Sequence, residues 1–212
     1  MHIEPGVLAA GKVAAANVAA LALVAAAAWP VARRPALALR TLLAAAFFTL
    51  CMQAFHLKVG PSELHFVGAM PMYLAFGLVP TLLGFALGLL LQGLLFEPAD
   101  LVHLAVNTLS LAVPLLALHA TIGRRVGAVT LRTVLELDAT YYAGVTLMVG
   151  FWLSMATVAT PLAEWARFAA SYAAVVALEP VVTVAVLLAI GRARRRAWAA
   201  LCFDTSRTLH AR

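Results

Sequence analysis

The first two residues of the chain, together with a histidine much further along, are the groups best suited to bind a metal ion. Met1 and His2 open the sequence, and His65 ends the run Pro61–His65. The free amine of Met1, the backbone nitrogen of His2 and the imidazole of His2 can close two fused chelate rings around one ion, and His65 can supply a fourth nitrogen. Four nitrogens in a plane suit Ni(II) or Cu(II), and imidazole also binds Co(II). The alternative is that His2 is simply the second residue of an ordinary terminus.

Other polar side chains fall within apolar stretches. Gln92 and Asn107 are candidates to support a metal-bound imidazole or to gate the site, because such imidazoles usually donate their second N–H to an acceptor. An interhelical hydrogen bond is an equally good explanation for both residues. His56 can line an entry route or sit at the membrane interface. Glu179 precedes Pro180, which favours a kink in a helix over a transport role.

Residues for covalent chemistry do not form a set. Ser62, Ser110 and Ser154 lack the setting of a nucleophile elbow, and no phosphate-binding loop occurs. His103 and His119 are sixteen residues apart on one stretch, so they are separated by more than about 20 Å and cannot ligate one haem. We therefore expect no enzyme activity and no organic cofactor.

The composition is that of an integral membrane protein. Of 212 residues, 64% are hydrophobic and only 11% are charged, whereas soluble domains are near half apolar and a quarter charged. The net charge of +6 comes from basic residues at the ends of apolar stretches, where membrane topology requires them. We therefore expect the lipid bilayer of a cell membrane, and no nucleic acid, as a partner.

The apolar stretches predict an all-α bundle of about seven transmembrane helices. Their expected ranges are 7–32, 37–57, 66–78, 79–96, 101–121, 140–160 and 166–191. Gly77 and Pro80 supply the break between the third and fourth. A six-span alternative keeps 66–96 as one long tilted helix.

The distribution of charge favours seven spans, with the N-terminus outside and the C-terminus in the cytoplasm. Residues 1–191 then form one transmembrane domain with an N-terminal metal-binding segment, and 192–212 form a basic cytoplasmic tail. We expect 58–65 and 122–139 to be loops, and 192–203 to be a short interfacial helix. This topology puts residues 1–6 and the 58–65 loop on the same side of the membrane. It puts twelve of the fifteen basic residues on the cytoplasmic side: Arg33, Arg34, Arg40, Arg124, Arg125, Arg132, Arg192, Arg194, Arg195, Arg196, Arg207 and Arg212.

Three segments resemble the CbiM/NikM family, the substrate-binding membrane components of cobalt and nickel energy-coupling factor (ECF) transporters. They are the Met1-His2-Ile3 start followed by Pro5-Gly6, the run from Gly60 through His65 to Gly68, and the run from Gln92 to Ser110 that contains Asn107. The hydropathy profile is similar over the rest of the chain.

The resemblance implies a seven-helix bundle with the N-terminal segment tucked in from outside. Met1, His2 and His65 would hold Co²⁺ or Ni²⁺ as the transported substrate. A membrane coupling (T) subunit and two cytoplasmic ATPase subunits would be the partners. We thus expect the substrate-specificity component of an ECF-type ABC transporter. A structural or assembly membrane protein that binds no metal is the alternative.

Overall fold

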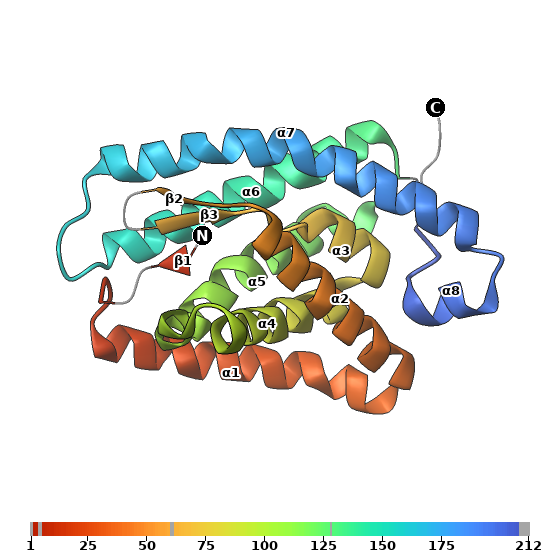
Figure 1. Cartoon of the computed structure of the whole chain (residues 1–212), viewed down its shortest axis with the longest axis horizontal. Coiled ribbons are helices and arrows are strands. Elements are labelled where there is room, and N and C mark those ends of the chain that lie inside the picture. The colour runs from red at the N-terminus through yellow and green to blue at the C-terminus, as the bar shows by residue number, and fades with distance from the viewer. Residues whose placement is uncertain (1, 4–5, 60–61, 128, 208–212) are drawn as a thin grey trace.

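The computed structural model describes residues 2–3, 6–59, 62–127 and 129–207. Helices make up its body, and they run as α1 (Ala10–Arg33), α2 (Pro35–Ala54), α3 (Ala69–Phe76), α4 (Leu78–Leu95), α5 (Leu104–Thr121), α6 (Leu131–Ser154), α7 (Leu162–Ala193) and α8 (Ala197–Cys202). Two short 3₁₀ turns, η1 (Pro98–His103) and η2 (Gly123–Arg125), flank α5. Figure 1 shows α7 along one side of the bundle and α1 along the other, with α4 and α5 between them.

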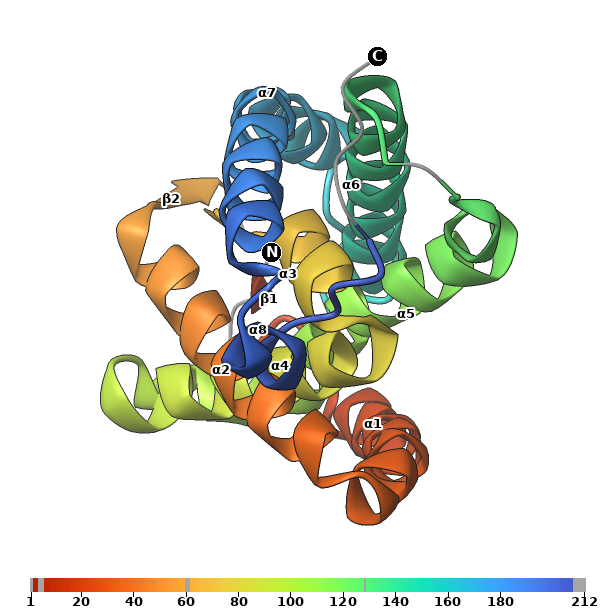
Figure 2. The same ribbon diagram turned by 90° about the vertical axis from the view of Figure 1, so that its right-hand side faces the viewer.

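The short helix α3 occupies the centre of the bundle. All eight of its residues are buried, and in the end-on view of Figure 2 the longer helices surround it. It ends at Gly77, whose φ of 87° is a left-handed value that favours glycine, and α4 begins at the next residue. The predicted break between residues 66 and 96 therefore exists, and it lies at Gly77. At eight residues, α3 is too short to cross a bilayer and depends on its neighbours for burial.

The helix α6 begins much earlier than the apolar pattern predicts. It starts at Leu131, where the Thr130 hydroxyl accepts a hydrogen bond from the backbone nitrogen of Thr133 at 3.2 Å as an N-terminal cap. The prediction of a loop over 122–139 is therefore wrong for its second half. Hydropathy misplaced the boundary because Arg132, Glu136 and Asp138 all lie in the first two turns of the helix.

Among the described residues, five helical segments are long and apolar enough to cross a membrane. They are Ala10–Arg33, Pro35–Ala54, Leu78–Leu95, Pro98–Thr121 and Leu162–Ala193. The predicted bundle of apolar helices is thus present in its coarse form. The count of seven crossings and the orientation of the two termini stay predictions.

A three-stranded antiparallel sheet, which the sequence did not predict, closes one end of the bundle. The strands are β1 (His2–Ile3), β2 (His56–Val59) and β3 (Ser62–His65), in the order β1-β3-β2. The expected 58–65 loop is therefore wrong, because most of that segment belongs to a β-hairpin. Its strands are only four residues long, and such short runs carry too little alternation to stand out from a loop.

The described part of the basic tail folds back onto the bundle. The Arg40 guanidinium on α2 donates to the carbonyls of Ala200 at 2.8 Å and Leu201 at 3.3 Å on α8. Beyond α8, the Phe203 ring stacks on Phe76, and the backbone nitrogen of Asp204 donates to the Ala75 carbonyl at 2.6 Å. A short helix over 197–202 agrees with the predicted one in the tail, but it packs against α2, and the residues that follow it contact α3.

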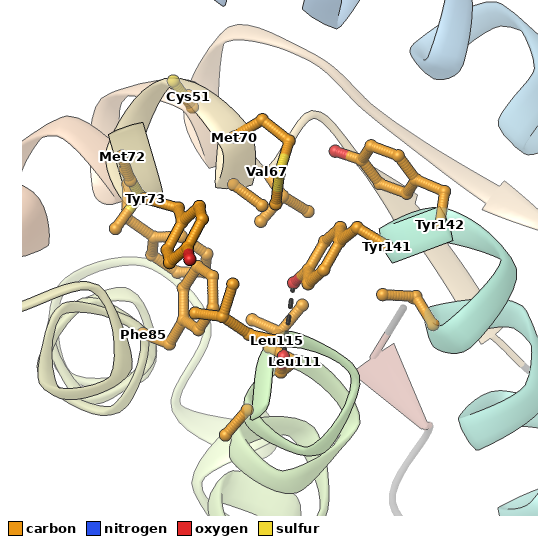
Figure 3. Close-up of a cluster of buried hydrophobic side chains, with 14 of the residues drawn as sticks. Cys51, Val67, Met70, Met72, Tyr73, Phe85, Leu111, Leu115, Tyr141 and Tyr142 are labelled. Carbon is orange, nitrogen blue, oxygen red and sulfur yellow. Dashed lines mark hydrogen bonds between the residues drawn. The ribbon is translucent and has the colours of Figure 1, made fainter. Parts of the chain in front are cut away.

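The core between α3, α5 and α6 is rich in aromatic and sulfur-containing side chains. Figure 3 shows Tyr73, Phe85 and Tyr141 packed together, and all three are fully buried. The Tyr141 hydroxyl donates to the Leu111 carbonyl at 3.4 Å, which satisfies a polar group inside this apolar region. This core fixes α3, and hence the strand that precedes it, against the longer helices.

Candidate functional site

The N-terminal strand β1 is an edge strand whose outer edge is covered by two side chains. The backbone nitrogen of Ile3 donates to Asn107 Oδ1 at 3.0 Å. The Ile3 carbonyl accepts a hydrogen bond at 2.8 Å from His103 Nδ1, which must carry the proton because a carbonyl can only accept. These two side chains take the place of a further strand, and Ile3 is fully buried. The start of the chain is thus inserted into the bundle and held by η1 and α5.

The pairing of β1 decides which way its backbone faces. The register places His2 opposite Glu63 and Ile3 opposite Ser62. The nitrogen and oxygen of Ile3 bond to Asn107 on α5 and to His103 in η1, so they point away from β3. Backbone groups of successive residues in a strand alternate in direction. The backbone nitrogen of His2 therefore faces β3, the strand that carries His65.

His65 lies at the end of β3, just before the chain enters the core. It is 3% exposed, and its Nε2 lies 3.0 Å from Glu63 Oε2 on the same strand. Residues two apart on a strand share a face, which explains how the carboxylate reaches the imidazole. Carboxylate–imidazole contacts of this kind orient histidines at metal sites.

His56 stands opposite His65 across the hairpin. The register of β2 and β3 pairs the two residues, and their ring centroids are 6.0 Å apart. His56 is exposed whereas His65 is buried. The structure thus brings a second imidazole to the open side of the sheet, where the sequence left an entry-route role open.

The predicted ligand set lies only partly within the described structure. Met1 and the side chain of His2 lie outside what the structure describes, whereas the His2 backbone and His65 lie on neighbouring strands. Among the described residues, no group of three or more His, Cys, Asp or Glu side chains is arranged to hold a metal ion. The predicted set needs only two such side chains, since its other nitrogens come from the backbone and the terminal amine.

Gln92 and Asn107, which the sequence treats alike, have different partners. Asn107 bonds directly to β1. Gln92 on α4 accepts a hydrogen bond from Gln53 Nε2 on α2 at 2.9 Å. Its contact is the interhelical hydrogen bond that the sequence analysis left open as the alternative.

Two residues at the site were missed by the sequence analysis. His103 was considered only as a haem ligand, yet it lies four residues before Asn107, so both side chains share one helical face. Glu63, which the sequence analysis did not single out, contacts His65. Their spacings of four and two residues were visible in the sequence, but the backbone atom that His103 binds is a hundred residues away.

The segment after β1 is also tied to the bundle. The backbone nitrogen of Thr157, in the link between α6 and α7, donates to the Val7 carbonyl at 2.9 Å. At the start of α1, Lys12 Nζ donates to the Met155 carbonyl at 2.6 Å. The strand β1 and the start of α1 are therefore held by contacts from η1, from α5 and from the link between α6 and α7.

One comparison with known proteins gives a match that spans these elements. The model of the CbiM family, described as "Cobalt uptake substrate-specific transmembrane region", matches residues 2–197, from β1 to the first residue of α8. Neither the curated proteins nor the solved structures give a match. The matched region includes all three strands, both residues that hold Ile3 and every apolar helix. The chain is therefore a multi-pass membrane protein that belongs to the CbiM family of cobalt-uptake, substrate-specific transmembrane regions.

Proposed function

We propose that this protein captures Co²⁺, or the chemically similar Ni²⁺, at the sheet end of the bundle for uptake into the cell. The ligands are the Met1 amine, the His2 backbone nitrogen, the His2 imidazole and the His65 imidazole. The observation that carries the proposal is the pairing of β1 with β3, which places the backbone of His2 on the strand next to the one that carries His65. Nitrogen donors in such a set suit both ions.

The residues around β1 and β3 support this role. His103 and Asn107 hold the backbone of Ile3, so they place the residue before it, His2, within a fixed sheet register. Glu63 orients the His65 ring and makes it a better electron donor. His56, on the exposed side of the hairpin, offers a first contact for an incoming ion.

Uptake also needs an energy source, which we propose lies in other subunits. We expect a membrane coupling subunit and cytoplasmic ATPase subunits of the ECF type, with this chain as the substrate-specificity component. Co-expression of this chain with and without such subunits, followed by measurement of cobalt uptake, tests the assignment. Equal cobalt uptake in both cases would remove the need for these partners.

The proposed role of the Met1 amine as a ligand can be tested directly. An uncleaved N-terminal extension turns the amine into an amide and removes one chelate ring, so Co(II) binding should be lost. A C-terminal extension of equal length is the matched control and should leave binding intact. Isothermal titration with Co(II) measures both, and unchanged affinity with the N-terminal extension would overturn the ligand set.

Co(II) binding should also weaken below about pH 6. An imidazole, whose ordinary pKa is about 6.5, must be neutral to bind a metal ion.

The orientation in the membrane follows from the two ends of the bundle. The sheet lies at one end, whereas the α1–α2 link and α8 lie at the other, as Figure 1 shows. We propose that the sheet end faces outward, because the arginine-rich segments are at the opposite end. In a background without Cys51 and Cys202, Val158→Cys should react with a membrane-impermeant thiol reagent from outside, and Arg124→Cys should not. The reverse labelling pattern would invert the proposed topology.

A further inference from the structure

A buried acidic residue receives hydrogen bonds from two other elements. Glu179 on α7 is fully buried, and its Oε1 accepts from the backbone nitrogen of Met70 at 2.8 Å. Its Oε2 accepts from the backbone nitrogen of Gly68 at 3.2 Å and from the Tyr142 hydroxyl on α6. Figure 3 shows the Tyr142 hydroxyl pointing toward the segment that carries Val67 and Met70. One carboxyl group thus joins α7, α6 and the first turn of α3.

A second buried acid lies beside the first. Asp138 precedes Tyr142 by one turn of α6 and is also fully buried. One helical turn puts Asp138 on the face of α6 that carries Tyr142, whose hydroxyl contacts Glu179, so the two carboxyl groups lie on facing sides of α6 and α7. Within the described part of the chain, no hydrogen-bond donor reaches either oxygen of Asp138, and neither acid forms a salt bridge with a basic side chain.

The burial of the two acids on facing helices, with no donor on Asp138 among the described residues, argues for a proton between them. Two ionised carboxylates can only accept hydrogen bonds, and two adjacent negative charges in a dry interior repel each other strongly. Glu179 already has three donors, which is the environment of a carboxylate. Asp138 has none, which is the environment of a neutral acid that itself donates.

We propose that Asp138 and Glu179 form a buried site for one proton, in which the protonated Asp138 carboxyl donates to the Glu179 carboxylate and so fixes the start of α3. The titratable neighbours of this site are Tyr141 and Tyr142 on α6, Tyr172 on α7 and Cys51 on α2. All three tyrosines are buried, and as neutral phenols they add no charge to the site.

The position of the pair links it to the metal site. Gly68, which donates to Glu179, follows His65 by three residues and adopts a φ of 65°. The carboxylate thus holds the turn through which β3 enters the core, and with it the end of the strand that carries His65. In this respect Asp138 and Glu179 are positioning residues, and this part of the inference rests on the proposed metal-binding function.

Infrared spectroscopy of the purified protein tests the proton directly. The C=O stretch of a buried, protonated carboxylic acid should appear in the wild type and vanish in Asp138→Asn, which keeps the shape and a donor but has no acid. It should persist in Glu136→Gln, a matched change on the exposed face of the same helix. Absence of the band in the wild type, or its persistence in Asp138→Asn, would overturn the proposal.

Co(II) titration tests the positioning role. Asp138→Asn should bind like the wild type because its amide still donates to Glu179, whereas Asp138→Ala should bind about 10–100-fold more weakly. Glu179→Gln should also lose about 10–100-fold, because it turns an N–H group toward the donors of α3. Wild-type affinity in Asp138→Ala, or equal losses in Asp138→Asn and Asp138→Ala, would contradict this role. If the wild type binds no Co(II), the proposed function fails, whereas the infrared result still decides the proton site.

Discussion

Two clusters of buried polar groups hold the sheet, and they use different chemistry. At β1, the side chains of His103 and Asn107, neither of which is an acid, bind the backbone of Ile3. Beyond β3, the carboxylate of Glu179 binds the backbone of Gly68 and Met70. The first cluster covers the outer edge of β1, which is an edge strand of the described sheet. The second holds the junction between β3 and the buried helix α3.

The difference suggests a division of roles. A hydrogen bond to a charged group contributes roughly twice as much as one between neutral groups, so the acid pair suits a permanent structural junction. The contacts on Ile3 involve no carboxylate, so they position β1 without adding a second acid beside the proposed ligands. Substitutions in the two clusters should therefore affect different properties of the protein.

The largest effect on stability is expected at the acid pair. Glu179→Ala leaves two backbone N–H groups and the Tyr142 hydroxyl without their acceptor in a dry interior. We expect it to lower the free energy of unfolding by about 3–5 kcal/mol, measured by denaturation in detergent. Glu136→Ala, on the exposed face of α6, should change it by less than about 1 kcal/mol. Equal losses in the two variants would remove the special role of the buried acid.

A smaller loss of stability but a clear loss of metal affinity is expected at the His103 and Asn107 contacts with Ile3. Asn107→Ala leaves the Ile3 N–H without an acceptor, at a cost of about 1–3 kcal/mol, and should weaken Co(II) binding by about 10–100-fold. Thr108→Ala is the control, because within the described structure that hydroxyl donates to the Leu104 carbonyl of its own helix. If both variants bind Co(II) equally well, Asn107 does not position the ligands.

Loss of the Glu63 carboxylate on β3 should reduce Co(II) affinity less than Asn107→Ala does. Glu63→Gln keeps the shape of the side chain but weakens its contact with the His65 imidazole. We expect Co(II) affinity to fall by about tenfold without a measurable change in unfolding. Glu97→Gln, another acid on the same side of the bundle, is the comparison, and an equal fall in both would point to a general effect of charge.

The smallest effect is expected at Gln92. Its hydrogen bond with Gln53 joins α4 to α2, and loss of such an interhelical bond costs about 0.6–2 kcal/mol. Gln92→Ala should lower the melting temperature slightly and leave Co(II) affinity unchanged. A loss of affinity as large as that of Asn107→Ala would return Gln92 to the group of residues that support the metal.

Parts of the fold and of the site could be predicted from the sequence, and each part that could not has its own physical reason. The break at Gly77 was predicted because a glycine and Pro80 interrupt an apolar block that is too long for one span. The start of α6 was not, because hydropathy counts Arg132, Glu136 and Asp138 as loop residues. For the same reason Asp138 was never considered as a buried acid. The hydrogen bonds that hold Ile3 depend on residues a hundred positions away, and no local pattern records them.

We propose that His65 is a metal ligand at the end of the bundle where β1 is inserted. Co(II) titration near pH 7.5 of the wild type, His65→Ala and His119→Ala tests it most directly. His119 is the matched control, because it lies in the last turn of α5 and not in the sheet. Its Nδ1 shares a hydrogen bond with the Tyr73 hydroxyl at 2.7 Å. We predict that His65→Ala abolishes high-affinity binding and that His119→Ala binds like the wild type. Equal affinities for the wild type and His65→Ala would contradict the account.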